Sequence, residues 1–289
     1  MAMTRPSKDN FEFWLPMQES SGTRYDVTGH GCHALDSDLG GFEAPPSNTG
    51  HVQSAAADFE RSNTQGLYIP DNAAHHGDRD WCMGGWFYQE SDNWILMSKG
   101  GDGLTSNWCC FIDSSQYASF GIGVNGDTGW NNDYRARDTT VLSLATWYFY
   151  FAFWDMSAER GYIKIYDTSG SLVASDDTTL MDMGANNGPS IYFGTTADAS
   201  KPLDCPVTGN VDFADGRLEQ WWLYDGSLTA DNISWLVNGG KGRIWDDFFD
   251  TAGMPIWYSR MRKLDDLQRK WQKRLGLYDD LLDQGAVII

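Results

Sequence analysis

The stretch from residue 191 to residue 240 changes its hydrophobic period partway along, and this change constrains the fold more than any other feature. Over residues 217–224 the side chains follow the two-residue repeat of a β-strand. The repeat predicts one face with Leu218, Gln220, Trp222 and Tyr224 and the other with Arg217, Glu219, Trp221 and Leu223. From residue 229 apolar residues recur at spacings of three and four, which predicts a short helix. A strand, a tight turn and a surface helix therefore close a domain.

Both ends of this helix carry recognisable signals. Thr229 is of a residue type that caps helix N-termini, and Gly239 is typical of the position just past a helix end. The rest of the chain is rich in aromatic residues and glycine, with 14 Trp, 13 Tyr, 14 Phe and 31 Gly among 289 residues. This composition favours strands and turns over helices.

Further strands are expected along the chain, several of them as hairpins. The expected pairs are residues 81–89 with 93–99, 108–113 with 119–124, and 162–166 with 171–175. Residues 147–155 are apolar on both faces, which predicts a strand in the middle of a sheet with something packed on each side.

A set of short motifs resembles, in the same order, laminin-G-like domains of the concanavalin A-like lectin and glucanase class. The matching stretches are residues 13–16, 19–22, 25–31, 58–59 with 67–70, 81–88, 95–100, 147–148, 162–173 and 216–239. The resemblance implies an all-β fold: a two-sheet antiparallel jelly-roll sandwich, here with an appended C-terminal α-helical tail. We accordingly divide the chain into an N-terminal arm (1–10), a jelly-roll domain (11–243), and a linker with an amphipathic helical tail (244–289).

Charge and composition exclude several classes of function. The formal net charge is −19 and the pI about 4.4, so the chain should repel nucleic acid. No apolar run is long enough for a membrane span, and the first ten residues lack the apolar segment of a secretory signal. The five cysteines have no regular spacing, which favours reduced, buried thiols. A single disulfide bridge is the alternative.

We do not expect an enzyme. Glycosidases with this sandwich place two carboxylates on either side of the sugar bond, often in a Glu-x-Asp-x-x-Glu strand that is absent from this sequence. The acidic residues instead gather in predicted loops such as 176–177 and 246–247, where turn chemistry explains them. A polysaccharide-active glycosidase or lyase remains an alternative.

The resemblance also implies a structural calcium ion that joins the opening loop to the closing strand. Mapped onto this chain, its ligands are Asp26, Gly29 and Glu219, where Glu219 stands in place of the family's usual aspartate. Calcium accepts six to eight oxygen ligands in flexible geometry, so a glutamate is compatible. The alternative is that Asp26 forms a turn with Gly29 and that Glu219 pairs with an arginine.

Glycan binding is a further implication, and one loop offers the residue types for it. The candidate ligand-binding residues are Trp130, Asn132, Asp133 and Tyr134. An aromatic ring beside amide and carboxylate groups can form a sugar platform on a loop that the sandwich holds still. The alternative is that Trp130 anchors its loop on the sheet.

Beyond residue 243 the tail shows helical periodicity. Its apolar seam includes Leu264, Leu267, Trp271 and Leu275. A seam of this length has to be covered, so we expect it to dock on a protein partner or on a second copy of the chain. The alternative is that it packs back on its own domain.

These features together predict a non-catalytic binding or structural protein. Laminin-G-like domains usually meet their ligands outside cells, yet this sequence shows no export signal. A virion component that folds in the host and is released by lysis reconciles the two. We therefore expect a phage decoration, collar, tail or fibre-associated protein. This protein would attach to a glycan or a protein. A carbohydrate-binding module exported by a nonclassical route to the cell surface is the alternative.

Overall fold

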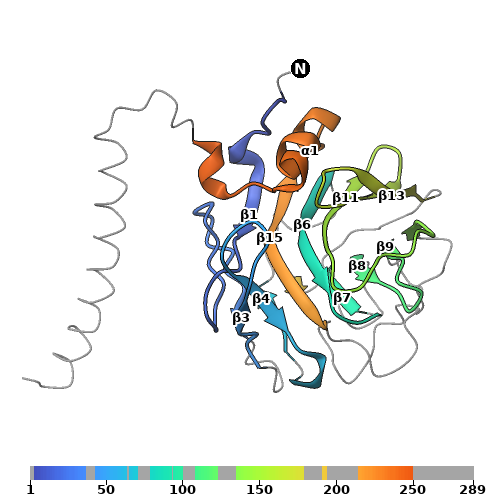
Figure 1. Cartoon of the computed structure of the whole chain (residues 1–289). Coiled ribbons are helices and arrows are strands. Elements are labelled where there is room, and N and C mark those ends of the chain that lie inside the picture. Colours follow the sequence, from blue (N-terminus) through green and yellow to red (C-terminus); the bar gives the residue numbers. More distant parts are fainter. Residues whose placement is uncertain are drawn as a thin grey trace, which may run out of the picture. The chain divides into compact units, whose positions relative to one another are not determined.

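The computed structural model describes residues 3–36, 43–63, 65–70, 79–92, 94–99, 108–122, 135–178, 191–193 and 214–249 (Figure 1). The chain divides into two compact units, Met1–Asp246 and Asp247–Ile289. The fold given below is that of the first unit. The predicted tail seam, Leu264 to Leu275, lies outside the described residues.

The described strands form two antiparallel sheets, which confirms the predicted all-β sandwich. The first sheet has the order β13-β12-β11-β6-β15-β4-β3, and β1 also pairs with β15. Its strands are β13 (Leu172–Asp177), β12 (Arg160–Tyr166), β11 (Trp147–Asp155), β6 (Trp81–Gln89), β15 (Gly216–Asp225), β4 (Ala56–Phe59), β3 (Ser47–Asn48) and β1 (Phe11–Leu15).

The second sheet has the order β10-β9-β8-β7-β14-β5-β2. Its strands are β10 (Arg135–Arg137), β9 (Ala118–Ile122), β8 (Trp108–Ile112), β7 (Trp94–Lys99), β14 (Ile191–Phe193), β5 (Leu67–Ile69) and β2 (Leu35–Asp36). The predicted hairpins β8–β9 and β12–β13 are confirmed. The hairpin predicted over residues 81–99 is wrong, because β6 lies in the first sheet and β7 in the second. The short turn between them crosses from one sheet to the other.

The core lies between the two sheets. Phe87 and Trp221 of the first sheet and Leu96 and Phe120 of the second belong to one cluster of buried side chains. Full burial of each such side chain contributes about 1.5–3 kcal/mol relative to exposure. This apolar interior is what holds the sheets face to face.

A second aromatic layer covers the opposite face of the first sheet. In it the rings of Trp14 and Trp222 stack with centroids 6.3 Å apart, and Phe11 meets Trp245 at 5.8 Å. Strand β11 lies between β6 and β12 and is buried on both faces. The prediction of a central, doubly covered strand at residues 147–155 is therefore confirmed.

The alternation predicted for residues 217–224 is interrupted in the structure. Between Glu219 and Trp222 strand β15 carries a bulge against β6, and Gln220 there has a left-handed φ of 55°. Because the bulge shifts the register, Leu218 shares the core with Trp221 and Leu223. The face assignment made from sequence therefore holds only up to the bulge.

Helix α1 (Ala230–Val237) follows β15 as predicted. The Thr229 hydroxyl accepts the backbone N–H of Asn232 at 3.2 Å, and the Asn232 side chain completes a capping box. The helix ends at Asn238, in a left-handed conformation, one residue before the glycine expected there. The short 3₁₀ helices are η1 (Lys8–Asn10), η2 (Arg61–Asn63), η5 (Asn238–Gly240) and η6 (Trp245–Phe248).

The N-terminal arm is fastened to the domain at Thr4 and at Asn10. The Asn232 amide donates to the carbonyl of Thr4 at 2.9 Å, and the Asn10 amide donates to the carbonyl of Asp225 at 3.3 Å. The arm thus lies along α1 and the end of β15. No helix in the described part of the chain is long and apolar enough to cross a membrane.

Candidate functional site

Asp26, the first predicted calcium ligand, organises the loop that follows β1. Its carboxylate accepts the backbone N–H groups of Trp14 (3.1 Å), Thr28 (2.9 Å), Gly31 (3.1 Å) and Cys32 (3.3 Å), together with the Thr28 hydroxyl (2.8 Å). Gly29 sits in the same loop with a left-handed φ of 97°. The carboxylate therefore acts as the centre of a turn.

Glu219, the second predicted ligand, holds a different loop. Its fully buried carboxylate accepts the backbone N–H groups of His51 (2.6 Å), Val52 (2.9 Å) and Gln53 (2.6 Å). Burial raises the pKa of Glu219 to about 7, against the lowering effect of the three N–H donors. Among the described residues the alternative of an arginine partner is wrong, because Glu219 binds these three N–H groups and Arg217 pairs with Asp58 and Glu90 instead.

These contacts do not fit the predicted calcium site. Backbone N–H donors surround both carboxylates, whereas calcium needs free oxygen lone pairs. Among the described residues, the acidic groups close enough to hold a metal ion are Asp58, Glu60 and Glu90, and neither predicted carboxylate belongs to that group. The geometry favours the alternative in which Asp26 makes a turn.

The negative charge of the Asp58, Glu60 and Glu90 cluster is already balanced in part. The Arg217 guanidinium lies 3.4 Å from the Asp58 carboxylate and 3.0 Å from the Glu90 carboxylate. It also stacks over the Tyr88 ring, 4.7 Å from the centroid. Burial and the neighbouring carboxylates raise the pKa of Glu60. These contacts explain the cluster as an ion-pair network.

The predicted sugar platform cannot be placed. Trp130, Asn132, Asp133 and Tyr134 all lie outside the described residues. The docking residues Leu264, Leu267, Trp271 and Leu275 do so as well.

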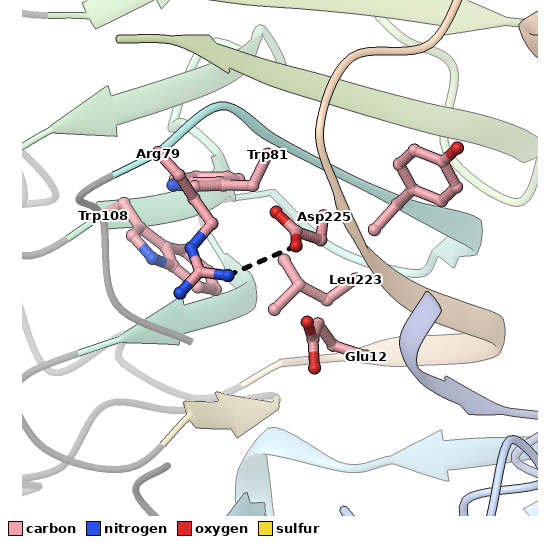
Figure 2. A pocket seen from close by; sticks show the side chains of 7 residues that line it. Glu12, Arg79, Trp81, Trp108, Leu223 and Asp225 are labelled. Atoms are coloured by element: carbon pink, nitrogen blue, oxygen red, sulfur yellow. Dashed lines mark hydrogen bonds and ion pairs between the residues drawn. The ribbon is translucent and has the colours of Figure 1, made fainter. Parts of the chain in front are cut away.

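A different group of residues lines a small open hollow of about 10 Å³, with room for about one water molecule (Figure 2). Its lining comes from β1, from the segment before β6, and from β6, β8 and β15: Glu12, Arg79, Trp81, Trp108, Leu223, Tyr224 and Asp225. We call this the rim hollow. It lies where strands of both sheets come together, and none of its residues was singled out from the sequence as a site.

A bulge in β1 places the first of these residues. Phe11 pairs with Tyr224 and Phe13 with Leu223, so Glu12 is the additional residue on β1. Bulges re-aim a side chain at the edge of a sheet. Glu12 is consequently half-buried at the hollow, although its position in an apolar strand, FEFWL, predicts a residue facing solvent.

The charged part of the hollow combines two carboxylates and one guanidinium. The Arg79 Nη1 atom lies 3.2 Å from Asp225 Oδ2, the pair joined by the dashed line in Figure 2. Figure 2 also shows Leu223 between the Asp225 and Glu12 side chains. Within the described part of the chain the Glu12 carboxylate makes no hydrogen bond or ion pair. Burial raises the pKa of Glu12 and Asp225 raises it further, while His30 and Arg79 lower it.

The remaining lining is apolar, with one unsatisfied donor. Trp81, Trp108 and Leu223 are 4%, 1% and 3% exposed, and the two indole centroids lie 5.3 Å apart. The Trp81 indole N–H has no acceptor among the described residues. Buried polar groups are normally paired. This N–H is shielded from solvent, so an incoming ligand meets the Glu12, Arg79 and Asp225 side chains at the mouth of the hollow instead.

The rim hollow is not predictable from the sequence, because its residues are far apart in the chain and each has an ordinary local explanation. Arg79 and Asp225 look like charged residues at strand ends. The one usable signal is Glu12, a carboxylate inside an otherwise apolar strand.

Comparison with known proteins supports the fold. No protein-family model matches the chain, and no curated protein sequence matches it. Among solved structures, the binding domain of botulinum neurotoxin serotype C1 is similar with a TM-score of 0.53 at 12% identity, over 80% of this chain and 52% of that one. This chain thus spans about half of that domain.

Two further solved structures are similar at lower scores. Domain 4 of AbnA, an extracellular arabinanase from Geobacillus stearothermophilus in complex with arabinotriose, gives a TM-score of 0.48 at 14% identity, over 78% of this chain and 97% of that domain. The LG1-3 region of the laminin alpha2 chain gives a TM-score of 0.41 at 15% identity, over 55% of this chain and 29% of that one. At 12% identity, the likeness to the neurotoxin binding domain is one of fold alone.

Proposed function

We propose that this chain is a non-catalytic binding protein whose jelly roll takes a glycan at the rim hollow. The observation that carries the proposal is the Glu12 carboxylate, which has no partner among the described residues and lies beside the Arg79–Asp225 pair. Sugar hydroxyl groups both donate and accept hydrogen bonds. A donor on Arg79 next to acceptors on Glu12 and Asp225, at the mouth of an apolar hollow, provides what such a ligand needs.

The fold supports this role without specifying it. Jelly-roll sandwiches host many unrelated functions, so the argument rests on the site. Strands β1 and β15 hold Glu12 and Asp225 in a paired sheet, and rigid elements position a binding group more accurately than loops do.

The proposal is tested by glycan-array screening of the full chain, followed by titration of the best glycan. Arg79→Gln should weaken binding by about tenfold or more, which corresponds to about 1.4 kcal/mol. Arg160→Gln is a matched control, because Arg160 forms a similarly exposed ion pair with Asp177 at 2.9 Å on β12 and β13. Equal affinities of the two variants, or no glycan bound by the wild type, would contradict the proposal.

A second candidate, a glycoside-cleaving enzyme, is favoured by one observation. The raised pKa of Glu12 suits a general acid, and a second carboxylate, Asp225, lines the same hollow. Turnover of polysaccharides by the wild type that disappears in Glu12→Gln would establish this candidate. Binding without turnover across a polysaccharide panel would leave the binding protein as the function.

A more specific proposal concerns where the protein acts, and it rests on the sequence. We place the protein in a virus particle as an attachment component, with an exported carbohydrate-binding module as the alternative. Fractionation of a producing culture distinguishes the two. The virion role requires the chain to sediment with the particles, whereas free protein in the medium supports the exported module.

A further inference from the structure

On one side of the sandwich each sheet ends in a strand whose outer edge has no strand beside it among the described residues. Strand β13 is the last of the first sheet and β10 the last of the second, and the two lie in contact. The outer N–H and C=O groups of such an edge strand form a template on which another strand can pair. The fold therefore needs a way to keep these edges closed.

Two carboxylates close the edges reciprocally. The backbone N–H of Arg137 in β10 donates to the Asp176 carboxylate at 2.7 Å, and the backbone N–H of Ser175 in β13 donates to the Asp138 carboxylate at 2.9 Å. Each acceptor directly follows the opposite donor in sequence. We call these four residues the edge latch. The latch occupies N–H groups that a pairing strand would use.

The latch is strengthened by charge and held in place from the second sheet. Asp138 also accepts the backbone N–H of Thr140 at 2.6 Å. Burial raises the pKa of Asp138, but the hydrogen bonds from Thr140 and Ser175 lower it below its ordinary value. An ionised acceptor makes a stronger hydrogen bond than a neutral one. The Arg137 guanidinium lies 2.5 Å from the Asp113 carboxylate, which fixes β10 at the latch.

The covered edge of β13 suits pairing with an identical strand. Strand β13 has six residues, against three in β10, and no proline interrupts it. The Leu172 side chain on this strand is 51% exposed. Two copies of one edge can pair antiparallel about a twofold axis. Such pairing would extend the first sheet across both chains.

We infer that the edge latch closes the first sheet to a second copy of this chain, and that β13 pairs with β13 of another copy when the latch is lost. The partner is thus the chain itself, and the contact is a continuous sheet. This inference is independent of the proposed glycan binding, because neither β10 nor β13 lines the rim hollow.

Sedimentation velocity of the full chain, at concentrations from about 1 to 100 μM, tests the inference. Asp138→Ala combined with Asp176→Ala removes both acceptors of the latch. We expect this double variant to form species of at least about twice the wild-type mass, in a proportion that rises with concentration. The wild type is the reference, so any assembly through the C-terminal tail is common to both proteins.

A second double variant controls for the loss of two negative charges. Asp177→Ala combined with Asp9→Ala makes the same change in charge, but these carboxylates form ion pairs with Arg160 and Lys8 at the surface. It should sediment like the wild type. Equal association of the two double variants would overturn the inference, because charge alone would then explain the effect.

A third substitution separates edge pairing from loss of the fold. Ser175→Pro, added to the latch variant, removes an outer N–H group of β13, and proline is tolerated on edge strands. The wild-type mass should therefore return. Association that persists with Ser175→Pro would overturn the inference, because an unfolded chain associates without this edge. A latch variant that sediments like the wild type at every concentration would overturn it as well.

Hydrogen exchange locates the contact in the same proteins. The amides of residues 172–177 should lose protection in the latch variant at the lowest concentration and regain it at the highest. A loss of protection that is the same at all concentrations would contradict pairing through β13.

Discussion

The carboxylate of Glu219 accepts a 2.6 Å hydrogen bond from the backbone N–H of His51, a residue 168 positions earlier in the chain. Two further N–H groups of the same loop, those of Val52 and Gln53, bind this carboxylate. The loop is fastened at its other side by the His51 ring, whose Nε2 lies 2.6 Å from the carbonyl oxygen of Gly240. One buried side chain thus joins the closing strand to a loop before β4.

This burial should make stability depend on pH. The folded-state pKa of Glu219, about 7, lies above the ordinary value of 4.5 that applies in the unfolded chain. The folded protein therefore retains a proton that the unfolded chain releases. The resulting stabilisation is complete below pH 4.5 and is lost as pH rises through about 7, a change of at most about 3 kcal/mol.

Urea denaturation of the wild type and of Glu219→Gln at about pH 5 and pH 8 measures this effect. The variant cannot titrate at this position, so its unfolding free energy should fall less between the two values. An identical fall in both proteins would show that Glu219 ionises at an ordinary pH.

Gly85 should not tolerate even a methyl group. A Cβ atom at this position would lie 2.5 Å from Cγ of Trp221, the fully buried residue of the β15 bulge. We expect Gly85→Ala to lower the free energy of unfolding by about 1–3 kcal/mol through overpacking. Equilibrium urea denaturation gives the value.

A double variant tests whether the clash with Trp221 is the cause. Trp221→Leu is costly by itself because it leaves a cavity. Combined with Gly85→Ala, it should cost less than the two single changes added together. Strict additivity would place the cause of the Gly85 effect elsewhere.

Asp26 should stabilise the fold independently of calcium. In Asp26→Asn an amide N–H₂ group would face backbone N–H groups such as that of Thr28, which now bind the carboxylate. Leaving buried donors without an acceptor should cost about 1–3 kcal/mol. We expect calcium added after a chelator to leave the Tm of both proteins unchanged. A rise in the wild-type Tm that Asp26→Asn abolishes would re-establish the calcium site.

The C-terminal seam should control assembly. The full chain is expected to form oligomers or to bind a partner, and a chain ending at residue 249 should be a monomer, because the seam of Leu264, Leu267, Trp271 and Leu275 is removed. Light scattering after gel filtration measures both masses. Trp271→Glu in the full chain should mimic the truncation. A monomeric full chain without a partner would mean that the seam packs within its own chain.

The sequence by itself determined the local elements. Alternating and doubly apolar runs indicated β11 and β15, and Thr229 marked the start of α1, because backbone period and capping depend on neighbouring residues. The order of motifs predicted the sandwich through its resemblance to laminin-G-like domains.

Only the tertiary structure decided which strands pair and where the register slips. Strand β6 pairs with β11 and β15 rather than with β7, its neighbour in the chain, and the bulges at Glu12 and Gln220 turn side chains away from the faces that alternation assigns. Pairing and register follow from contacts between segments distant in sequence. For the same reason Glu12, Arg79 and Asp225 meet only where β1, β15 and the start of β6 come together in the first sheet.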